Sequence, residues 1–183
     1  SRSLAFNETD LLWVSPSPNI PTFETALIYL GTCLLEGTNV SEGRGTTKPF
    51  ELIGAPWIDP YDLSRILNDY GFDGALFRPA YFTPVFSKYQ GQLCGGVQIH
   101  ITDHKKVKAF EIGVKLIYTL MDRYKEHFAF LPPYKEGSHP PFDRLAGTDI
   151  IRLRNTDYKT MIKQFEEELQ AFRRLKEKYH LYC

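Results

Sequence analysis

The 183-residue sequence has no excess of charge of either sign, and this excludes several classes of partner. Lys and Arg together number 22, as do Asp and Glu, so the formal net charge at pH 7 is zero. A neutral chain has no long-range attraction to nucleic acid or to an anionic membrane surface. We therefore predict that nucleic acid is not a partner.

Long apolar runs are also absent. No run approaches the roughly 20 residues that a membrane-spanning helix needs, so we predict no membrane span. The first ten residues, SRSLAFNETD, do not have the pattern of a signal peptide. They begin abruptly, with an arginine and an apolar pair, and we expect the chain to be part of something longer.

Cysteine is scarce, and metal-binding patterns are weak. Cys33, Cys94 and Cys183 are odd in number and far apart, which matches neither a disulfide framework nor a zinc ribbon. The letters HITDH at residues 100–104 look like a metal cluster, but a zincin-type motif needs both histidines on one helix face. His100 is expected on a strand instead. We predict no metal site and no cofactor.

Hydrophobic periodicity predicts an α+β domain. Residues 97–102 alternate between apolar and polar side chains, which is typical of a half-buried strand. Residues 107–124 and the C-terminal stretch from Tyr158 to Tyr179 carry apolar side chains at three- and four-residue spacing, which predicts two long amphipathic helices. We expect a small mixed sheet packed against these two helices in a single domain.

Local signals predict the shorter elements. Asp59 and Pro60 have the residue types of an N-cap and a first helical position, so a helix should run from there to Gly71, with Leu63, Ile66, Leu67 and Tyr70 facing the core. Three further elements are expected: a helix over residues 22–29, a strand over 50–58, and an edge strand over 75–83 that contains Pro79.

The chain divides into two parts. Residues 1–22 contain three prolines that force their neighbours into extended conformations, which predicts a connector anchored by Trp13. Residues 23–183 should form the α+β domain. This domain carries a glycine-rich segment, residues 31–59, which includes the letters EGTNVSEGRGTT. Residues 84–96, with the Gly95-Gly96 pair, are expected to form a loop.

The glycine-rich segment has the composition of a ligand-binding loop. Between Gly31 and Gly45 it places two glutamates, an arginine, an asparagine and several hydroxyls among closely spaced glycines. Glycine permits positive φ and close approach of another molecule, and polar side chains on such a loop can orient a ligand. We predict that the segment forms one wall of a binding or catalytic cleft.

Glu36 and Glu42 are the candidate catalytic pair. Hydrolysis of a glycosidic bond uses two carboxyl groups roughly 5 to 9.5 Å apart. Six residues can span that distance if the loop curls. The alternative is structural: one glutamate caps backbone N–H groups in the turns, and the other pairs with Arg44.

Arg44 lies between two glycines, and its guanidinium could clamp a carboxylate through two hydrogen bonds. A salt bridge to Glu36 or Glu42 is the alternative. The other substrate-contact candidates are polar side chains on the same segment and on the two neighbouring strands: Asn39, Ser41, Thr46, Arg78, Tyr81 and His100. Two of these also have structural interpretations, Asn39 as a turn residue and His100 as a satisfied hydrogen-bonding group.

Phosphate binding is the competing interpretation of the glycines, and the spacing does not favour it. The segment has no G-x-x-x-x-G-K-[ST] pattern, and Gly43-x-Gly45 alone is too short for a dinucleotide fingerprint. The chain also lacks the G-x-S-x-G sequence of an acyl-transferring serine.

Four blocks carry a resemblance to a known family: LLWVSPSPNIPT (11–22), TCLLEGTNVSEGRGTTKPFELIGAPW (32–57), FRPAYFTPVFSKYQGQLCGGVQIHITD (77–103) and FDRLAGTD (142–149). With its Tyr-His-Leu-Tyr ending, the sequence resembles the C-terminal half of the NamZ-type exo-β-N-acetylmuramidases. The resemblance implies a glycosidase that releases N-acetylmuramic acid from non-reducing ends of peptidoglycan fragments, in cell-wall turnover and recycling.

The resemblance also implies a partner domain and a location. In that family the cleft lies between a Rossmann-like N-terminal domain, which should hold the principal catalytic glutamate, and a smaller C-terminal domain. We expect this chain to be the C-terminal domain alone, with its Glu36, Asn39, Glu42 and Arg44 lining the cleft, and to be exported from a bacterium to the periplasm, outer surface or medium. The alternative is a non-catalytic module that binds peptidoglycan or sugar.

Overall fold

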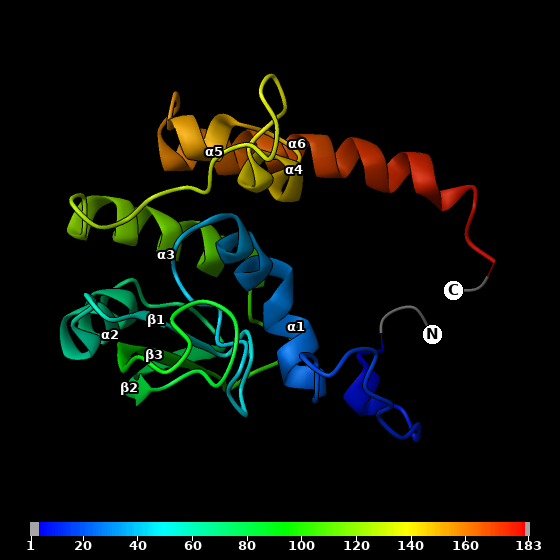
Figure 1. Ribbon diagram of the computed structural model, residues 1–183. Coiled ribbons are helices and arrows are strands. Elements are labelled where there is room, and N and C mark those ends of the chain that lie inside the picture. Colours follow the sequence, from blue (N-terminus) through cyan, green and yellow to red (C-terminus); the bar gives the residue numbers. More distant parts are fainter. Residues whose placement is uncertain (1–3, 182–183) are drawn as a thin grey trace.

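The computed structural model describes residues 4–181 and has an α+β architecture (Figure 1). In this part of the chain, three strands form one sheet in the order β1-β3-β2, with bounds Leu52–Ala55, Ala75–Phe82 and Cys94–Ile101 for β1, β2 and β3. The predicted α+β class is confirmed. The sheet is antiparallel rather than mixed, because both β1 and β2 run against the central strand β3.

The strand predictions are confirmed except at the start of β3. β2 is an edge strand that contains Pro79, as predicted, and β1 lies inside the expected stretch. β3 begins three residues before Val97, so the Gly95-Gly96 pair lies in the strand and not in a loop. Close packing explains the pair, because a Cβ on Gly96 would lie 1.9 Å from the carbonyl oxygen of Ile53.

Helix α2 (Pro60–Asp69) begins as its sequence predicts. The Asp59 carboxylate accepts hydrogen bonds from two backbone N–H groups of the first turn, and Pro60 is the first helical residue. The Asn68 side chain bonds both the N–H and the carbonyl oxygen of Phe77, which satisfies the outer edge of β2. Tyr70 was predicted in the core, and that is wrong: it lies past the helix end and is 42% exposed.

Two helices cross above the sheet. Helix α1 (Phe23–Thr32) is capped by Thr22 as predicted, but it runs into the glycine-rich segment and continues as the 3-10 helix η2 (Cys33–Gly37). Helix α3 (Ala109–Arg123) is the first of the two predicted long helices. The two backbones touch, because a Cβ on Gly113 would lie 2.4 Å from the Gly31 carbonyl oxygen.

The C-terminal region forms three helices, α4 (Pro141–Ala146), α5 (Ile150–Leu153) and α6 (Tyr158–Glu177). Helix α6 is the second predicted long helix, but it packs on α3 rather than on the sheet (Figure 1). Met161 contacts Tyr118, and Phe165 packs edge-on against Phe110. Further along its apolar stripe, Leu169, Phe172 and Leu175 are exposed, so the predicted pair of helices does not cover the sheet together.

The described part of the expected connector, residues 4–22, is irregular and contains one 3-10 turn, η1 (Phe6–Glu8). Trp13 packs edge-on against Phe6 and against Phe23 of α1, with ring centroids 5.1 and 6.3 Å away. Residues 1–3 and 182–183 lie outside the described residues. The structure therefore does not test what is predicted for the start of the connector, the end of the domain and Cys183.

Neither a membrane helix nor a metal cluster is present in residues 4–181. None of the helices there is both long and apolar enough to span a bilayer. The same residues contain no group of three or more His, Cys, Asp or Glu side chains placed to hold a metal ion. In the HITDH letters, His104 packs on Phe23 with ring centroids 5.3 Å apart, whereas His100 is exposed on β3.

Candidate functional site

Much of the glycine-rich segment is interior, which differs from the exposed wall that its composition predicts. Thr38 and Val40 are fully buried, and Ser41 and Glu42 are 1% and 3% exposed. Several of its hydroxyl side chains form hydrogen bonds with its own backbone. Ser41 Oγ accepts a hydrogen bond from Gly43 N at 3.1 Å. The segment is therefore largely buried, is stabilised in part by hydrogen bonds within itself, and has limited exposed surface.

Ser41 and Thr46, two predicted substrate contacts, are engaged inside the protein. The backbones of Ser41 and Gly54 exchange hydrogen bonds of 2.9 and 3.0 Å, which joins the first half of the segment to β1 in its second half. The Thr46 hydroxyl donates to Gly43 O at 2.6 Å and accepts from Lys48 N at 3.1 Å. Their hydroxyls stabilise the turn around Gly43, whose φ is 78°.

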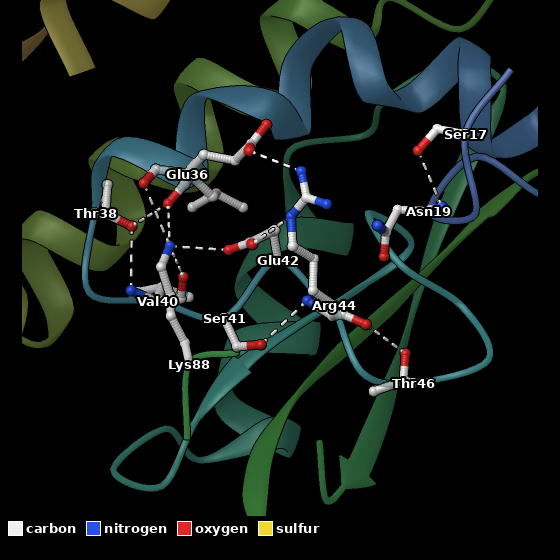
Figure 2. Close-up of polar contacts among 12 residues, drawn as sticks. Ser17, Asn19, Glu36, Thr38, Val40, Ser41, Glu42, Arg44, Thr46 and Lys88 are labelled. Carbon is white, nitrogen blue, oxygen red and sulfur yellow. Dashed lines mark hydrogen bonds and ion pairs between the residues drawn. The ribbon is translucent and has the colours of Figure 1, made fainter. Parts of the chain in front are cut away.

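Three charged side chains of this segment and one from the loop after β2 form a cluster that we call the charge cluster: Glu36, Glu42, Arg44 and Lys88 (Figure 2). Arg44 Nη2 lies 2.9 Å from Glu36 Oε2, and Arg44 Nε lies 3.1 Å from Glu42 Oε1. Lys88 Nζ lies 2.8 Å from Glu42 Oε2. Two carboxylates and two cations compensate each other, which a buried charge such as Glu42 requires.

Lys88 is the member that the sequence analysis did not identify. It lies between β2 and β3, and its ammonium group also donates to Leu35 O at 2.9 Å and Val40 O at 3.0 Å. All three hydrogen bonds of an ammonium group are thereby used. The two neighbours of Lys88 have positive φ, at Ser87 and Tyr89, so the loop backbone is bent tightly around it. No motif in the sequence indicates this contact.

The geometry separates the two candidate glutamates. Glu42 is almost fully buried, and both of its carboxylate oxygens are in ion pairs, so it functions as a structural anion. Glu36 keeps 28% of its side chain exposed. Arg44 holds both glutamates and lies over the Phe50 ring at 5.1 Å, as in the salt-bridge alternative. A clamp on a ligand carboxylate by Arg44 stays a prediction, but its guanidinium already has two anionic partners.

Burial and the Glu36 charge affect two neighbours of the cluster. Burial raises the pKa of the Cys33 thiol, and the negative charge of Glu36 raises it further. The same two causes, in the same order, raise the pKa of the Tyr29 hydroxyl. Both groups are therefore protonated at neutral pH, which makes neither of them an activated nucleophile.

Asn39 joins the segment to a different part of the chain. Its side-chain amide donates to His127 O at 2.7 Å and accepts from Ala129 N at 2.9 Å. These bonds fix the stretch that follows α3, where the His127 ring stacks on Trp57 with centroids 5.7 Å apart. Asn39 therefore has a structural role, and it is not the positive-φ turn residue of the alternative interpretation.

The three remaining candidates lie on the sheet and do not converge. Arg78 and His100 are exposed, and Arg78 donates to the side chain of Gln98 at 2.6 Å. Tyr81 is 60% exposed and is three residues from Arg78 on the same strand, so it points to the opposite face. The loop after β2, rather than the strand, reaches the glycine-rich segment, through a bond from Val85 N to Gly45 O of 2.9 Å.

An open hollow of about 430 Å³ adjoins the exposed side of Glu36, and we call it the Glu36 hollow. It combines a carboxylate, a guanidinium, a phenol and apolar groups. Its lining residues are Glu36, Tyr134, Pro141, Arg144 and Leu145. Such a mixture suits a polar ligand with some apolar surface, and the volume is in the usual range of about 300–1,000 Å³ for small-molecule sites.

Comparison with protein-family models gives a match over residues 27–182 to the family described as exo-β-N-acetylmuramidase NamZ, C-terminal. The chain belongs to this family. A curated relative, the peptidoglycan β-N-acetylmuramidase NamZ of Bacillus subtilis (strain 168), is 47% identical over 184 residues. That alignment covers 99% of this chain and 43% of the relative.

Two solved structures from the same fold are similar to this NamZ C-terminal domain. Both are DUF1343 family proteins from Bacteroides fragilis NCTC 9343, and each is 28% identical. For one, the TM-score is 0.84, and the match covers 100% of this chain and 48% of that protein. For the other, the TM-score is 0.62, and the match covers 92% of this chain and 43% of that protein. The chain thus spans less than half the length of each of these relatives.

Proposed function

We propose that this chain is the C-terminal part of a glycoside hydrolase that releases N-acetylmuramic acid from non-reducing ends of peptidoglycan fragments during cell-wall turnover and recycling. It forms one wall of the substrate cleft. A Rossmann-like N-terminal domain forms the other wall and holds the principal catalytic glutamate. The name of the B. subtilis relative, a peptidoglycan β-N-acetylmuramidase, supports the substrate class.

One observation carries the cleft-wall role. Glu36 is held by Arg44 at 2.9 Å but remains 28% exposed, at the edge of the Glu36 hollow. A carboxylate fixed in this way can accept hydrogen bonds from sugar hydroxyl or acetamido groups without reorganising. The buried part of the charge cluster holds the segment in place.

Incubation of this chain with a chromogenic N-acetylmuramic acid glycoside tests the division of labour. We expect binding without turnover, because neither glutamate is free to act opposite the other: Glu42 is buried in two ion pairs. A rate well above background that disappears in Glu36→Gln would show that catalysis lies within this chain, and would contradict the proposal.

A non-catalytic peptidoglycan-binding module is the second candidate, supported by the same hollow. The two are separated in a longer protein that joins this chain to the N-terminal region of its relatives. For a cleft wall, Glu36→Gln should lower kcat/KM by roughly tenfold or more, because a charge-assisted bond near the reacting sugar is lost. For an independent module, kcat on a small soluble glycoside should not change.

We also propose an exported location, in the periplasm, at the outer surface or in the medium of a bacterium, because that is where the peptidoglycan layer is. Fractionation of the cells that produce the protein tests it. Recovery of the protein entirely with cytoplasmic markers would contradict this location without affecting the proposed chemistry.

A further inference from the structure

The FDRLAGTD letters form most of helix α4 and the turn after it, and they contribute Arg144 and Leu145 to the Glu36 hollow. Phe142 is fully buried and Asp143 is 6% exposed. Asp143 accepts two hydrogen bonds of 2.7 Å from Arg152, in a bidentate pair. The helix is thus fixed in position from both sides, and Arg144 projects from a rigid support.

Gly37 places this helix directly beside the glycine-rich segment. A Cβ on Gly37 would lie 2.5 Å from the Cα of Phe142, so only glycine allows the approach. The Gly37 carbonyl oxygen also accepts a hydrogen bond of 2.9 Å from Leu131 N, which ties down the stretch leading to Tyr134. Both sides of the Glu36 hollow are therefore attached to the same point of the chain.

Arg144 is a cation without an anionic partner in residues 4–181. Its side chain is exposed, and it makes no ion pair with any of the described acidic residues. The neighbouring carboxylate of Asp143 forms an ion pair with Arg152, and the carboxylate of Glu36 forms one with Arg44. A guanidinium in a hollow with no internal partner is available to an anion from outside.

We propose that Arg144 is a specificity-determining residue that binds the lactyl carboxylate of N-acetylmuramic acid in the Glu36 hollow. This rests on the proposed function, and it moves the carboxylate contact from Arg44 to Arg144. A guanidinium binds a carboxylate through two parallel hydrogen bonds. Glu36 accepts from the hydroxyl or acetamido groups of the same sugar, and the 75% exposed Tyr134 provides an aromatic surface for the ring.

NMR titration of this chain with two sugars tests the assignment. N-acetylglucosamine is the matched ligand, because it lacks only the lactyl group. Arg144→Ala should weaken N-acetylmuramic acid binding by roughly 10- to 100-fold, the range for one charged hydrogen-bonding group, and leave N-acetylglucosamine within about twofold. Arg144→Lys should recover part of the preference, because it keeps the charge but loses the bidentate geometry.

Arg173→Ala is the control variant. Arg173 is an exposed arginine on the half of α6 that extends away from α4 (Figure 1), and the variant should bind both sugars as the unchanged protein does. An undiminished preference for N-acetylmuramic acid in Arg144→Ala, or an equal loss for both sugars, overturns the inference alone. Absence of binding to either sugar by the unchanged chain overturns the proposed function and this inference with it.

Discussion

Lys88 fixes the path of the glycine-rich segment from outside that segment. Its ammonium group bonds two main-chain carbonyl oxygens and one carboxylate oxygen, and only 22% of its side chain is exposed. Without it, Glu42 keeps only Arg44 as a partner and two buried carbonyl groups lose their donor. Unpaired buried groups of this kind are far more costly than a lost surface contact.

Lys88→Met should lower the free energy of unfolding by about 3–5 kcal/mol, because it leaves the buried Glu42 charge incompletely compensated. Urea denaturation measures the change. Lys105→Met is the matched control: Lys105 pairs with Glu8 at the surface and is 70% exposed, so its loss should cost less than about 1 kcal/mol.

A second variant separates charge from packing. Glu42→Gln combined with Lys88→Met should be less destabilising than the sum of the two single changes, because the double variant no longer buries an uncompensated charge. Simple additivity of the two effects would contradict the role assigned to this ion pair.

At the scale of elements, the two halves of α6 differ in what their apolar side chains contact. Met161 is fully buried against α3, whereas Leu169, Phe172 and Leu175 are 45%, 56% and 54% exposed. The apolar periodicity that predicts this helix is continuous over both halves. It therefore indicates a helix and its apolar face, but not how much of that face is packed. The part of α6 beyond α4 extends past the helices that it packs against (Figure 1).

Substitutions along this helix should show the boundary. Met161→Ala should lower the free energy of unfolding by about 2–5 kcal/mol through loss of buried contacts and the cavity left behind. Leu175→Ala should change it by less than about 0.5 kcal/mol. Both are measured by urea denaturation. A large cost for Leu175→Ala would mean that another surface covers this stripe in solution, which a dependence on protein concentration would reveal.

Local sequence signals predict the helices and strands, whereas the candidate site depends on contacts between residues far apart in the sequence. The Asp59-Pro60 cap, the Thr22 cap and the alternation in β3 depend on neighbours within a few residues, so they can be read from sequence. The roles of Lys88 and Arg144 depend on segments that are far away in sequence. A serine that bonds its own turn, such as Ser41, also has the same local sequence as one that faces a ligand.

For the molecule as a whole, burial of groups that ionise at high pH links folding to alkaline pH. Burial raises the pKa of Cys94, which is fully buried at the start of β3, from 9.0 to about 11. Burial also raises the pKa values of the Tyr118 and Tyr124 hydroxyls. In each case the folded state holds the proton more tightly than the unfolded state, so stability present below the unfolded pKa is lost as pH rises through the folded pKa.

The free energy of unfolding should therefore fall between pH 9 and about 11, with Cys94 contributing about 2 kcal/mol of the loss. Urea denaturation at a series of pH values measures it. Cys94→Ala should flatten this part of the profile, whereas the tyrosine contribution should remain at higher pH. An identical slope in the variant would contradict the assignment to Cys94.

The Lys88 contacts also set an order of events in folding. Lys88 follows Leu35 by 53 residues and Glu42 by 46, so the segment it holds lies well before it in the chain. During synthesis from the N-terminus, Glu36 and Glu42 leave the ribosome long before the cation that fixes them. Contacts with such sequence separation form late and slowly. Glu36, which is proposed to face the sugar, is therefore made early, but the ion-pair cluster that holds it is complete only after Lys88 has been added.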